Sequence, residues 1–315
     1  MNNHSSDSTR PCLVSIIIPC YKAEKELPQA LQSITEQIHT QWELVVVNDG
    51  WEDSTEKIIT DFKALHPKQK IKYIKHPKNQ GLGATRNTAM AAATGDYIAF
   101  LDHDDLWEKD HLSIGLKTLS EEKTDIYYSS VSVFDSTGKS DYWEWGPTPE
   151  DLLQFPNSIY ARNFIQPSAA IITKSFLQRL GPMDTDSHVH FCEDHDFWIR
   201  AVILGGKFSH ASTITSKYRY SNPNAATAKI DLMLKNDLYV QKKHLASSVF
   251  PRSVVRNAIA NNYKRLSDHY WKKKHFNSLF YLCVSLYWKP TDTRSVRRLI
   301  KGIFYWPVIF EKLRN

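Results

Sequence analysis

The sequence has few of the features that mark several protein classes. Its four cysteines are spread singly with no CxxC pair, whereas a disulfide framework or a zinc ribbon needs clustered cysteines. Its longest mostly apolar stretches, residues 276–288 and 302–310, are shorter than the roughly 18–20 residues of a membrane-spanning helix. Residues 1–12 are polar, lack the apolar run of a secretory leader, and predict a disordered tail. These absences favour a protein of the reducing cytoplasm.

The composition is otherwise that of an ordinary globular protein. Hydrophobic residues make up 42% of the 315 residues, aromatic residues 12% and charged residues 23%. Disorder, collagen and coiled coil are thereby excluded as descriptions of the whole chain. The length allows one large catalytic domain with an appendage, or two modest domains.

Charge is distributed unevenly along the chain. Residues 251–315 contain 14 Lys and Arg against 3 Asp and Glu, although the whole chain carries a net charge of only +6. Such a basic, aromatic-rich segment predicts contact with an anionic partner, and residues 294–315 have the pattern of a helix that lies on an anionic bilayer, interrupted at Pro307. Nucleic acid shares this charge signature, but no known binding motif accompanies it, so we expect no nucleic-acid partner. The alternative that this helix packs on the body of the protein stays open.

The first hundred residues alternate between strand and helix patterns. Short β-branched runs predict strands that are buried on both faces, and apolar residues at helical spacing predict helices between them. The expected strands are residues 13–19, 42–48, 71–76 and 96–102, and the expected helices are 27–34, 54–65 and 83–93. Because strands and helices joined by short links form right-handed crossovers, we expect a Rossmann-like α/β fold with a mostly parallel central sheet flanked by helices.

The pattern changes in the second half of the chain. We expect a strand at residues 126–134, a strand running into a helix at 168–181, a helix at 192–206, and then only helices, at 230–245, 253–274, 275–286 and 294–313. The chain therefore divides into a predicted catalytic domain at residues 13–225 and a predicted all-α C-terminal region at residues 226–315. The C-terminal region is the basic and aromatic one, and is the candidate for association with a membrane.

Polar residues follow three of the expected strands. These are Pro19-Cys20-Tyr21, Asn48-Asp49 and the acidic run Asp102-His103-Asp104-Asp105. Ligands of open α/β sheets bind beyond the carboxyl ends of the strands, so these ends predict a site.

The acidic run after the fourth strand predicts a divalent metal. Packed carboxylates repel one another, and burying them without a counterion is costly. Mg²⁺ or Mn²⁺ resolves that repulsion, because these ions prefer oxygen ligands and keep positions open for phosphates. The alternative is that Asp105 or Glu108 caps the next helix while the other acids face solvent.

Four motifs together resemble the family-two inverting glycosyltransferases with the GT-A fold. In chain order they are VSIIIPCYKAEKEL, ELVVVNDGWEDST, NQGLGATRNTAMAAATGDYIAFLDHDD and EDHDFWIR. Each motif alone is weak, but the four in this order and spacing are specific. The resemblance covers about residues 13–222, and it implies an enzyme of the bacterial surface-polysaccharide type.

The resemblance implies a donor site at the strand ends. Pro19 and Tyr21 would line the base pocket, with Tyr21 against the face of the nucleobase, and Asp49 would accept a hydrogen bond from the base imide. Asp102 would lie beside the ribose, and Asp104 would hold the Mn²⁺ or Mg²⁺ that bridges the donor diphosphate.

Further residues flank the donor in the same family pattern. Gly81, Gly83 and Arg86 match the segment beside it, and glycines allow close approach of the backbone to a diphosphate. Arg86 could form an ion pair with a phosphate of the donor, or it could be a solvated charge at the start of a helix. His103 is a secondary candidate because it lies between the two acids assigned to ribose and metal.

The resemblance also implies the catalytic base. Asp194, in the Glu193-Asp194 pair, matches the carboxylate that takes a proton from the acceptor hydroxyl while that hydroxyl attacks the anomeric carbon. Glu193 and Asp196 should raise its pKa by like-charge repulsion, and Glu193 is itself a secondary candidate. Capping the helix that starts here is an alternative role that Asp194 could combine with catalysis. Trp198, on the same helix, is expected in the core or stacked on a sugar.

Three features depart from the family pattern or compete with it. Trp51 stands where relatives commonly have a small Ser, and Ser221 stands where many have a His that helps to bind metal or phosphate. The remaining metal ligand is therefore unassigned. His188, His190 and Cys192 alternate, so a strand would place them on one face and leave zinc as a less favoured alternative.

The expected activity is transfer of one sugar from a UDP-, GDP- or dTDP-linked donor to a glycan or a polyprenyl-linked glycan, at the inner face of the cell membrane. One alternative is a non-catalytic glycan- or nucleotide-binding scaffold on the same fold. A sugar-nucleotide pyrophosphorylase is a further alternative, but it would want a Gly-rich basic loop after the first strand, which PCYKAEKEL lacks.

Overall fold

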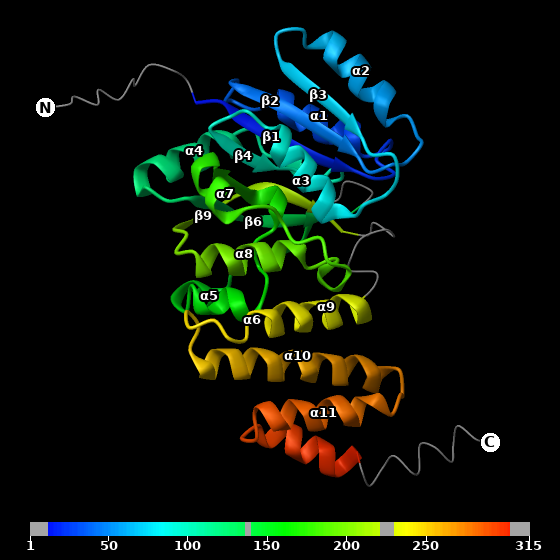
Figure 1. Cartoon of the computed structure of the whole chain (residues 1–315), viewed down its shortest axis with the longest axis vertical. Coiled ribbons are helices and arrows are strands. Elements are labelled where there is room, and N and C mark those ends of the chain that lie inside the picture. Colours follow the sequence, from blue (N-terminus) through cyan, green and yellow to red (C-terminus); the bar gives the residue numbers. More distant parts are fainter. Residues whose placement is uncertain (1–11, 136–139, 221–229, 303–315) are drawn as a thin grey trace, which may run out of the picture. The chain divides into compact units, whose positions relative to one another are not determined.

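The computed structural model describes residues 12–135, 140–220 and 230–302 and divides into two compact units (Figure 1). Unit 1 comprises residues 1–147, 164–185 and 200–222, and unit 2 comprises 148–163, 186–199 and 223–315. The predicted tail at residues 1–12 lies almost wholly outside the described residues, as does the end of the predicted helix 294–313.

Unit 1 is built on one sheet, which has nine strands within the described residues, in the order β3-β2-β1-β4-β8-β6-β9-β5, with β7 paired to β6. The strands are β1 (Val14–Cys20), β2 (Trp42–Asn48), β3 (Lys70–Lys75), β4 (Tyr97–Phe100), β5 (Leu106–Trp107), β6 (Ile126–Phe134), β7 (Ser140–Trp145), β8 (Ala170–Thr173) and β9 (Phe208–Arg219). The four strands from β3 to β4 are parallel to one another, as predicted. The GT-A-like α/β fold expected from the sequence is confirmed.

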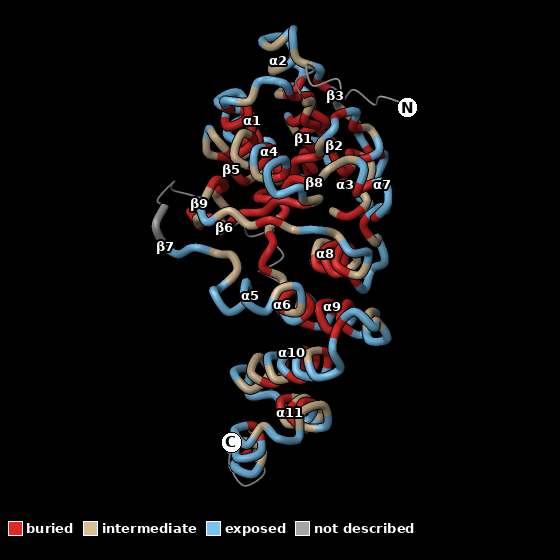
Figure 2. Tube along the Cα trace, turned by 90° about the vertical axis from the view of Figure 1, so that its left-hand side faces the viewer, coloured by how far each residue is buried: buried red, intermediate tan, exposed pale blue. Residues whose placement is uncertain are grey.

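The helices of unit 1 present apolar faces to this sheet. They are α1 (Leu27–Thr35), α2 (Thr55–Leu65), α3 (Leu82–Ala92), α4 (His111–Glu122) and α7 (Lys174–Leu180). Ile16 pairs with Leu44 on one side and Ala99 on the other, and all three are fully buried. Each fully buried Ile or Leu contributes about 1.5–3 kcal/mol. Figure 2 shows the central strands β1 and β2 as buried and the outer turns of the helices of unit 1 as exposed.

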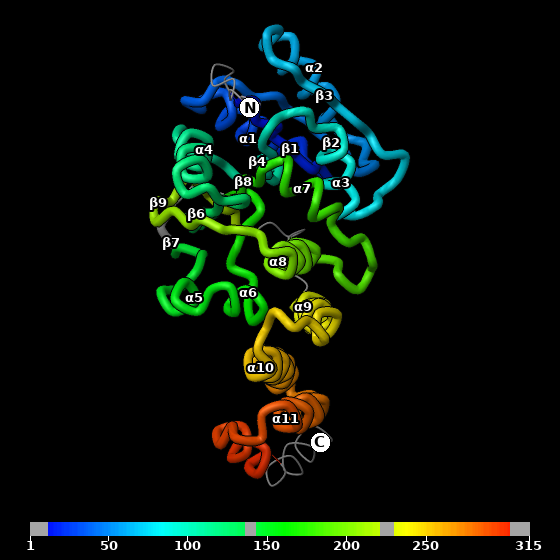
Figure 3. The backbone as a smooth tube through the Cα atoms, turned by 60° about the vertical axis from the view of Figure 1, so that its left-hand side comes forward, coloured from blue at the N-terminus to red at the C-terminus, as the bar shows by residue number. Residues whose placement is uncertain are grey.

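Unit 2 is helical among its described residues. It contains α5 (Pro149–Leu153), α6 (Asn157–Ala161), the start of α8 (Glu193–Ile203), α9 (Ile230–Lys243), α10 (Arg252–Lys272) and α11 (Asn277–Trp288), and residues 293–302 are also helical. α10 packs against α6, α9 and α11, and Figure 3 shows α9, α10 and α11 nearly end on, one beside the next. Across the described ranges, no helix has both the length and the apolarity needed to cross a membrane.

Candidate active site

The carboxyl ends of β1 and β2 lie at the same edge of the sheet, because the two strands are parallel and Cys20 pairs with Asn48. β4 stops earlier, at Phe100 opposite Ile17, so Pro19 pairs with β2 alone. The loop after β4 returns to this edge, where the His103 Nδ1 lies 3.2 Å from the Pro19 carbonyl oxygen. Pro19 and His103, both predicted from the sequence, are thereby brought together.

Asp49 organises the loop that leads into α3. Its side chain is buried; Oδ1 lies 2.8 Å from the His76 Nδ1 and accepts from the Gln80 N–H, and Oδ2 accepts from the Gly81 N–H at 2.9 Å. Gly81 has φ +91°, in the region that glycine tolerates best. A carboxylate offers about four acceptor positions, so three contacts leave capacity for one more donor.

The turn after β2 admits only a glycine at position 50. Gly50 has φ +73°, and a Cβ there would lie 2.4 Å from the Lys78 carbonyl carbon. The turn after β2 therefore packs directly on the loop whose backbone N–H groups donate to Asp49.

An aromatic pair stands at the predicted base pocket. Tyr21 and Trp51 are 37% and 38% exposed, and their ring centroids lie 5.3 Å apart, edge to face. The Lys22 Nζ lies 4.4 Å from the Trp51 ring centroid, within cation–π distance. The Trp51 backbone is fixed by the Asn48 side chain, which donates to its carbonyl at 2.9 Å and accepts from its N–H at 3.0 Å. Trp51 thus extends the Tyr21 surface.

Two residues predicted at the donor form an ion pair with each other. The Arg86 Nη2 donates to both carboxylate oxygens of Asp102, at 2.7 and 3.0 Å. Arg86 lies on α3 together with the buried Gly83 and is only 2% exposed, whereas the Asp102 side chain keeps 21% exposure. Arg86 is therefore not a solvated helix-start charge, and it orients the carboxylate of Asp102.

The acids that follow β4 have separate environments. Asp105 is 1% exposed and accepts from the Ser168 hydroxyl at 2.6 Å and from the Arg219 N–H at 2.9 Å. Burial, with the nearby charges of Asp104 and Asp102, raises the pKa of Asp105 well above its ordinary value. The alternative in which Asp105 caps the next helix is wrong, since the N-cap of α4 is Asp110.

Negative charge is concentrated at this edge of the sheet. Burial and then the charges of Asp53, Asp104 and Asp102 also raise the pKa of the Cys20 thiol. The Arg219 Nε donates to the Asp104 carbonyl oxygen at 2.8 Å and so fixes the backbone of the acidic loop. No three His, Cys, Asp or Glu side chains are grouped as metal ligands in the parts of the chain that the structure describes. A metal at Asp104 would therefore need further oxygen ligands, such as water or substrate phosphate.

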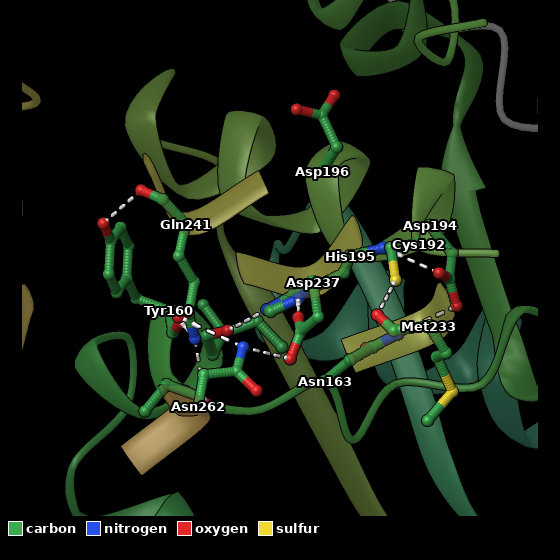
Figure 4. A network of polar contacts seen from close by, with 12 residues as sticks. Tyr160, Asn163, Cys192, Asp194, His195, Asp196, Met233, Asp237, Gln241 and Asn262 are labelled. Carbon is green, nitrogen blue, oxygen red and sulfur yellow. Dashed lines mark hydrogen bonds and ion pairs between the residues drawn. The ribbon is translucent and has the colours of Figure 1, made fainter. Parts of the chain in front are cut away.

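Asp194 lies in unit 2, in the first turn of α8 (Figure 4). Its Oδ2 accepts from the Asn163 amide at 2.8 Å, and its Oδ1 accepts from the N–H of His195 at 2.8 Å. Glu193, His195 and Asp196 are buried, whereas Asp194 is only half-buried. Of the three acids in this turn, Asp194 is the one that is not fully buried.

The buried side of this turn is fixed by a polar network. The His195 Nδ1 lies 2.6 Å from the Asp237 Oδ1, and its Nε2 lies 2.7 Å from the Ile159 carbonyl oxygen. Burial lowers the pKa of His195, but Asp237 and the Ile159 carbonyl outweigh that effect and raise it overall. The Asn262 amide donates to the Asp237 Oδ2 at 2.8 Å, so α9 and α10 both hold the start of α8.

Two neighbours of Asp194 have structural roles. Asp196 is fully buried and contacts the Lys243 Nζ at 2.7 Å and the His244 Nε2 at 2.8 Å, so its charge is compensated. The like-charge repulsion that we expected from Asp196 is correspondingly offset. Trp198 is fully buried and has no surface for a sugar, which decides between the two roles expected for it.

The alternation of His188, His190 and Cys192 does not form a strand. His188 lies in a 3₁₀ turn, η2 (Ser187–Val189), and keeps 66% of its side chain exposed. Cys192 is buried, its Sγ lies 3.5 Å from the Met233 carbonyl oxygen, and burial raises its pKa, which disfavours the thiolate that zinc requires. The zinc alternative therefore has no geometric support.

Several residues that contact the candidate donor residues of unit 1, or the segment around Asp194 in unit 2, carry no sequence signal. They are His76, Asn163, Ser168, Arg219 and Asp237. Arg219 contacts Asp105 across 114 residues, and Asp237 contacts His195 across 42. No local motif contains either pair, so only the fold reveals them.

This chain has the features expected of a GT-A fold: the central sheet, the polar strand ends and the acidic loop after β4. Residues 15–181 match Glycosyl transferase family 2, and the chain belongs to that family. This membership favours a glycosyltransferase over the non-catalytic scaffold and the pyrophosphorylase.

Known relatives agree with this assignment. EpsH of Bacillus subtilis is 27% identical over 313 residues, covering 96% of this chain and 81% of EpsH. WfgD of Escherichia coli, a UDP-Glc:α-D-GlcNAc-diphosphoundecaprenol β-1,3-glucosyltransferase, is 31% identical over 124 residues, covering 39% of this chain and 47% of WfgD. For several curated relatives the chain spans less than half of their length, and for one of them 19%.

A solved structure shows the same fold. The mannosyltransferase PcManGT from Pyrobaculum calidifontis, in complex with GDP-Man and Mn²⁺, aligns with a TM-score of 0.62 at 17% identity, over 94% of this chain and 80% of that one.

Proposed function

We propose that the enzyme transfers one sugar from a nucleotide sugar to a hydroxyl of a glycan or lipid-linked glycan, by direct displacement that inverts the anomeric carbon. The observation that carries this proposal is the division of the acids in the first turn of α8. Glu193 and Asp196 are buried, and Asp196 forms an ion pair with Lys243 and contacts His244, whereas Asp194 is only half-buried and has a fixed orientation. A general base needs that combination of access and orientation.

Unit 1 would bind the donor through the residues predicted from the sequence. The Tyr21 ring, extended by Trp51, would contact the base, and Asp49 would use its remaining acceptor capacity for the base imide. Asp102, oriented by Arg86, would accept from the ribose hydroxyls. Gly81 and Gly83 would let the start of α3 approach the diphosphate.

Asp104 would hold Mn²⁺ or Mg²⁺. The concentration of negative charge that raises the pKa of Asp105 and Cys20 favours a cation at this edge of the sheet. Oxygen ligands suit either ion, and Mg²⁺ commonly binds through one or two carboxylates together with substrate phosphates. When bound, the ion would neutralise charge on the leaving nucleoside diphosphate. PcManGT, whose structure contains Mn²⁺, supports this part of the proposal.

Asp194 would take the proton of the acceptor hydroxyl. One of its oxygens accepts from Asn163 and the other from the backbone of its own helix, so the carboxylate cannot rotate freely. The network of His195 with Asp237 keeps the helix turn in place behind it. An oriented carboxylate contributes roughly 10²–10⁴-fold to such a step.

The relative WfgD supports the proposed class of acceptor. WfgD acts on an undecaprenol-diphosphate-linked sugar, and we propose a similar lipid-linked or glycan acceptor in surface-polysaccharide assembly. The enzyme would work in the cytoplasm at the inner face of the membrane, held there by its basic C-terminal region. The catalytic and C-terminal regions would remain those predicted, residues 13–225 and 226–315.

A thermal-shift titration with UDP, GDP, dTDP and CDP, each with and without Mn²⁺, tests the donor site. Ligand at about 100 times its dissociation constant stabilises the fold by about 2.7 kcal/mol, a shift of a few degrees. We expect one nucleotide to stabilise the enzyme in a metal-dependent way, and Asp104→Ala to abolish the metal dependence. Glu52→Ala, an exposed acid of the same unit, is the matched control. The assignment fails if no nucleotide stabilises the protein, or if Asp104→Ala keeps the metal dependence.

A further inference from the structure

The helix α11 has an apolar outer face. It contains no charged residue, and Phe276, Phe280, Cys283 and Tyr287 recur along it at intervals of four, three and four residues. All four are exposed, the aromatic three by 58%, 61% and 77%. We call these four residues the α11 stripe.

The opposite face of α11 packs on α10. Ser278, Leu282 and Ser285 are buried, and the Ser285 hydroxyl donates to the Ala260 carbonyl oxygen at 2.8 Å. At about 100° per residue, the α11 stripe lies about 160° around the helix from these three residues. The stripe therefore points away from the helix that α11 packs on.

Single exposed apolar residues are ordinary, but a continuous stripe is not. A surface helix normally turns charged or polar residues to water on the side opposite its core face. α11 instead has large aromatic side chains there. Such a face indicates a surface that becomes covered when the protein functions.

The charges around α11 identify what covers it. Lys272, Lys273 and Lys274, at the end of α10 and in the link to α11, are exposed, and Lys289 follows the last residue of α11. The sequence contains no Asp or Glu between Asp268 and Asp292. The stripe is thus framed by cations at both ends, which complements an anionic layer. A second copy of the same face would bring like charges together.

We propose that the α11 stripe lies in the interface of an anionic lipid bilayer, with its aromatic rings at the level of the headgroups and the flanking lysines on lipid phosphates. Interfacial helices combine an apolar face with aromatic side chains and adjacent cations in this way. Each lysine near an anionic surface strengthens binding by about fivefold. The inference rests on the part of the proposed function that places the enzyme at the membrane, and it assigns the contact to α11 in place of the predicted segment 294–315.

Co-sedimentation of the full chain with vesicles of phosphatidylcholine, with and without phosphatidylglycerol, tests the inference. We expect binding that requires phosphatidylglycerol. The double variant F280S/Y287S should weaken it at least about tenfold, and K272E/K274E should remove the preference for anionic vesicles. Leu65→Ser, at an apolar residue of α2 that is 76% exposed, is the matched control and should bind as the parent does.

Cys283 provides a second readout within the stripe. It is exposed, whereas Cys20 and Cys192 are buried, so a C12S variant should take a solvatochromic label at Cys283. We expect its emission to shift to the blue on anionic vesicles. The emission of the same label on the variant L65C/C12S/C283S should not shift.

Other occupants of the stripe give different results. Unchanged vesicle binding by F280S/Y287S, or no binding by the parent protein, overturns the inference. If deletion of residues 303–315 abolishes binding while F280S/Y287S retains it, the contact belongs to that segment and the inference is wrong. If F280S/Y287S converts a dimer into a monomer and vesicle binding is absent, a second copy covers the stripe. The nucleotide-induced thermal shift, measured on each variant, separates these outcomes from failure of the proposed function, because loss of membrane binding leaves it intact.

Discussion

The ion pair of Arg86 with Asp102 gives the sharpest quantitative test of the donor site. Breaking a buried ion pair by removing one partner costs roughly 3–5 kcal/mol. Because 21% of the Asp102 side chain is exposed, water can compensate it when Arg86 is replaced by the similarly long Met, and we expect a cost of about 2–3 kcal/mol. Asp102→Asn removes the carboxylate that pairs with the Arg86 guanidinium, and Arg86 is only 2% exposed. This substitution should therefore lower the free energy of unfolding by about 3–5 kcal/mol.

Urea unfolding of both single variants and of R86M/D102N measures this difference. Since the two side chains contact each other directly, the double variant should be more stable than the sum of the single effects predicts, by at least about 1 kcal/mol. Lys57 and Asp61, an exposed ion pair on α2, are the matched control and should couple by less than about 0.5 kcal/mol. Both single variants should also lose most of the nucleotide-induced thermal shift. Additive effects, or an unaltered nucleotide shift in R86M, would refute the pairing and its role in orienting Asp102.

Three further predictions concern residues around the same elements. Ser15, Lys70 and Thr94 lower the pKa of the buried Glu43 from 4.5 to about 2, more than offsetting its burial. The lowered pKa contributes about 3 kcal/mol to the free energy of unfolding. This contribution is present above pH 4.5 and is lost as the pH falls toward 2. The free energy of urea unfolding of Glu43→Gln should therefore depend less on pH over this window than that of the parent. Trp51→Ser should weaken nucleotide binding about tenfold, measured by calorimetry, without lowering the melting temperature by more than a few degrees. Asn163→Ala should move the acidic limb of kcat/KM to higher pH, because it removes a hydrogen bond that favours the charged form of the base, whereas an unmoved limb would assign Asn163 to packing alone.

The central parallel strands β1 and β2 could be predicted because each is a nearly continuous apolar run. Val14–Cys20 and Trp42–Asn48 are buried at every position, so no alternation or long-range partner is needed to recognise them. β9 could not be predicted in this way. Its sequence, FSHASTITSKYR, mixes polar and apolar residues, and the strand is stabilised by parallel pairing with β6 across 82 or more residues.

The candidate functional residues also fall into two groups, those that a local sequence pattern reveals and those that only the fold reveals. Asp49, Asp102 and Asp194 follow strand ends or open a helix, so local pattern and family resemblance find them. Asn163, which donates to Asp194, and Arg219, which donates to Asp105 and to the Asp104 carbonyl, come from distant segments and could not be found without the fold. Sequence proximity also gave a wrong expectation, namely that Asp196 repels the charge of the predicted base. Asp196 lies two residues from Asp194 but is buried against Lys243 and His244.

The central claim is that Asp194 is the base of an inverting transfer, and the Asp194→Asn variant tests it most directly. Once the thermal-shift titration has identified the nucleotide, and a screen of sugars linked to that nucleotide has identified the donor, transfer is measured at saturating donor. The anomeric configuration of the product is read by NMR. We predict an inverted anomeric configuration in the parent enzyme, and a rate about 10²–10⁴-fold lower in Asp194→Asn with an unchanged nucleotide shift. Asp186→Asn, at a half-exposed acid of the same unit, should transfer normally. Retained anomeric configuration, or substantial activity in Asp194→Asn, would contradict the account.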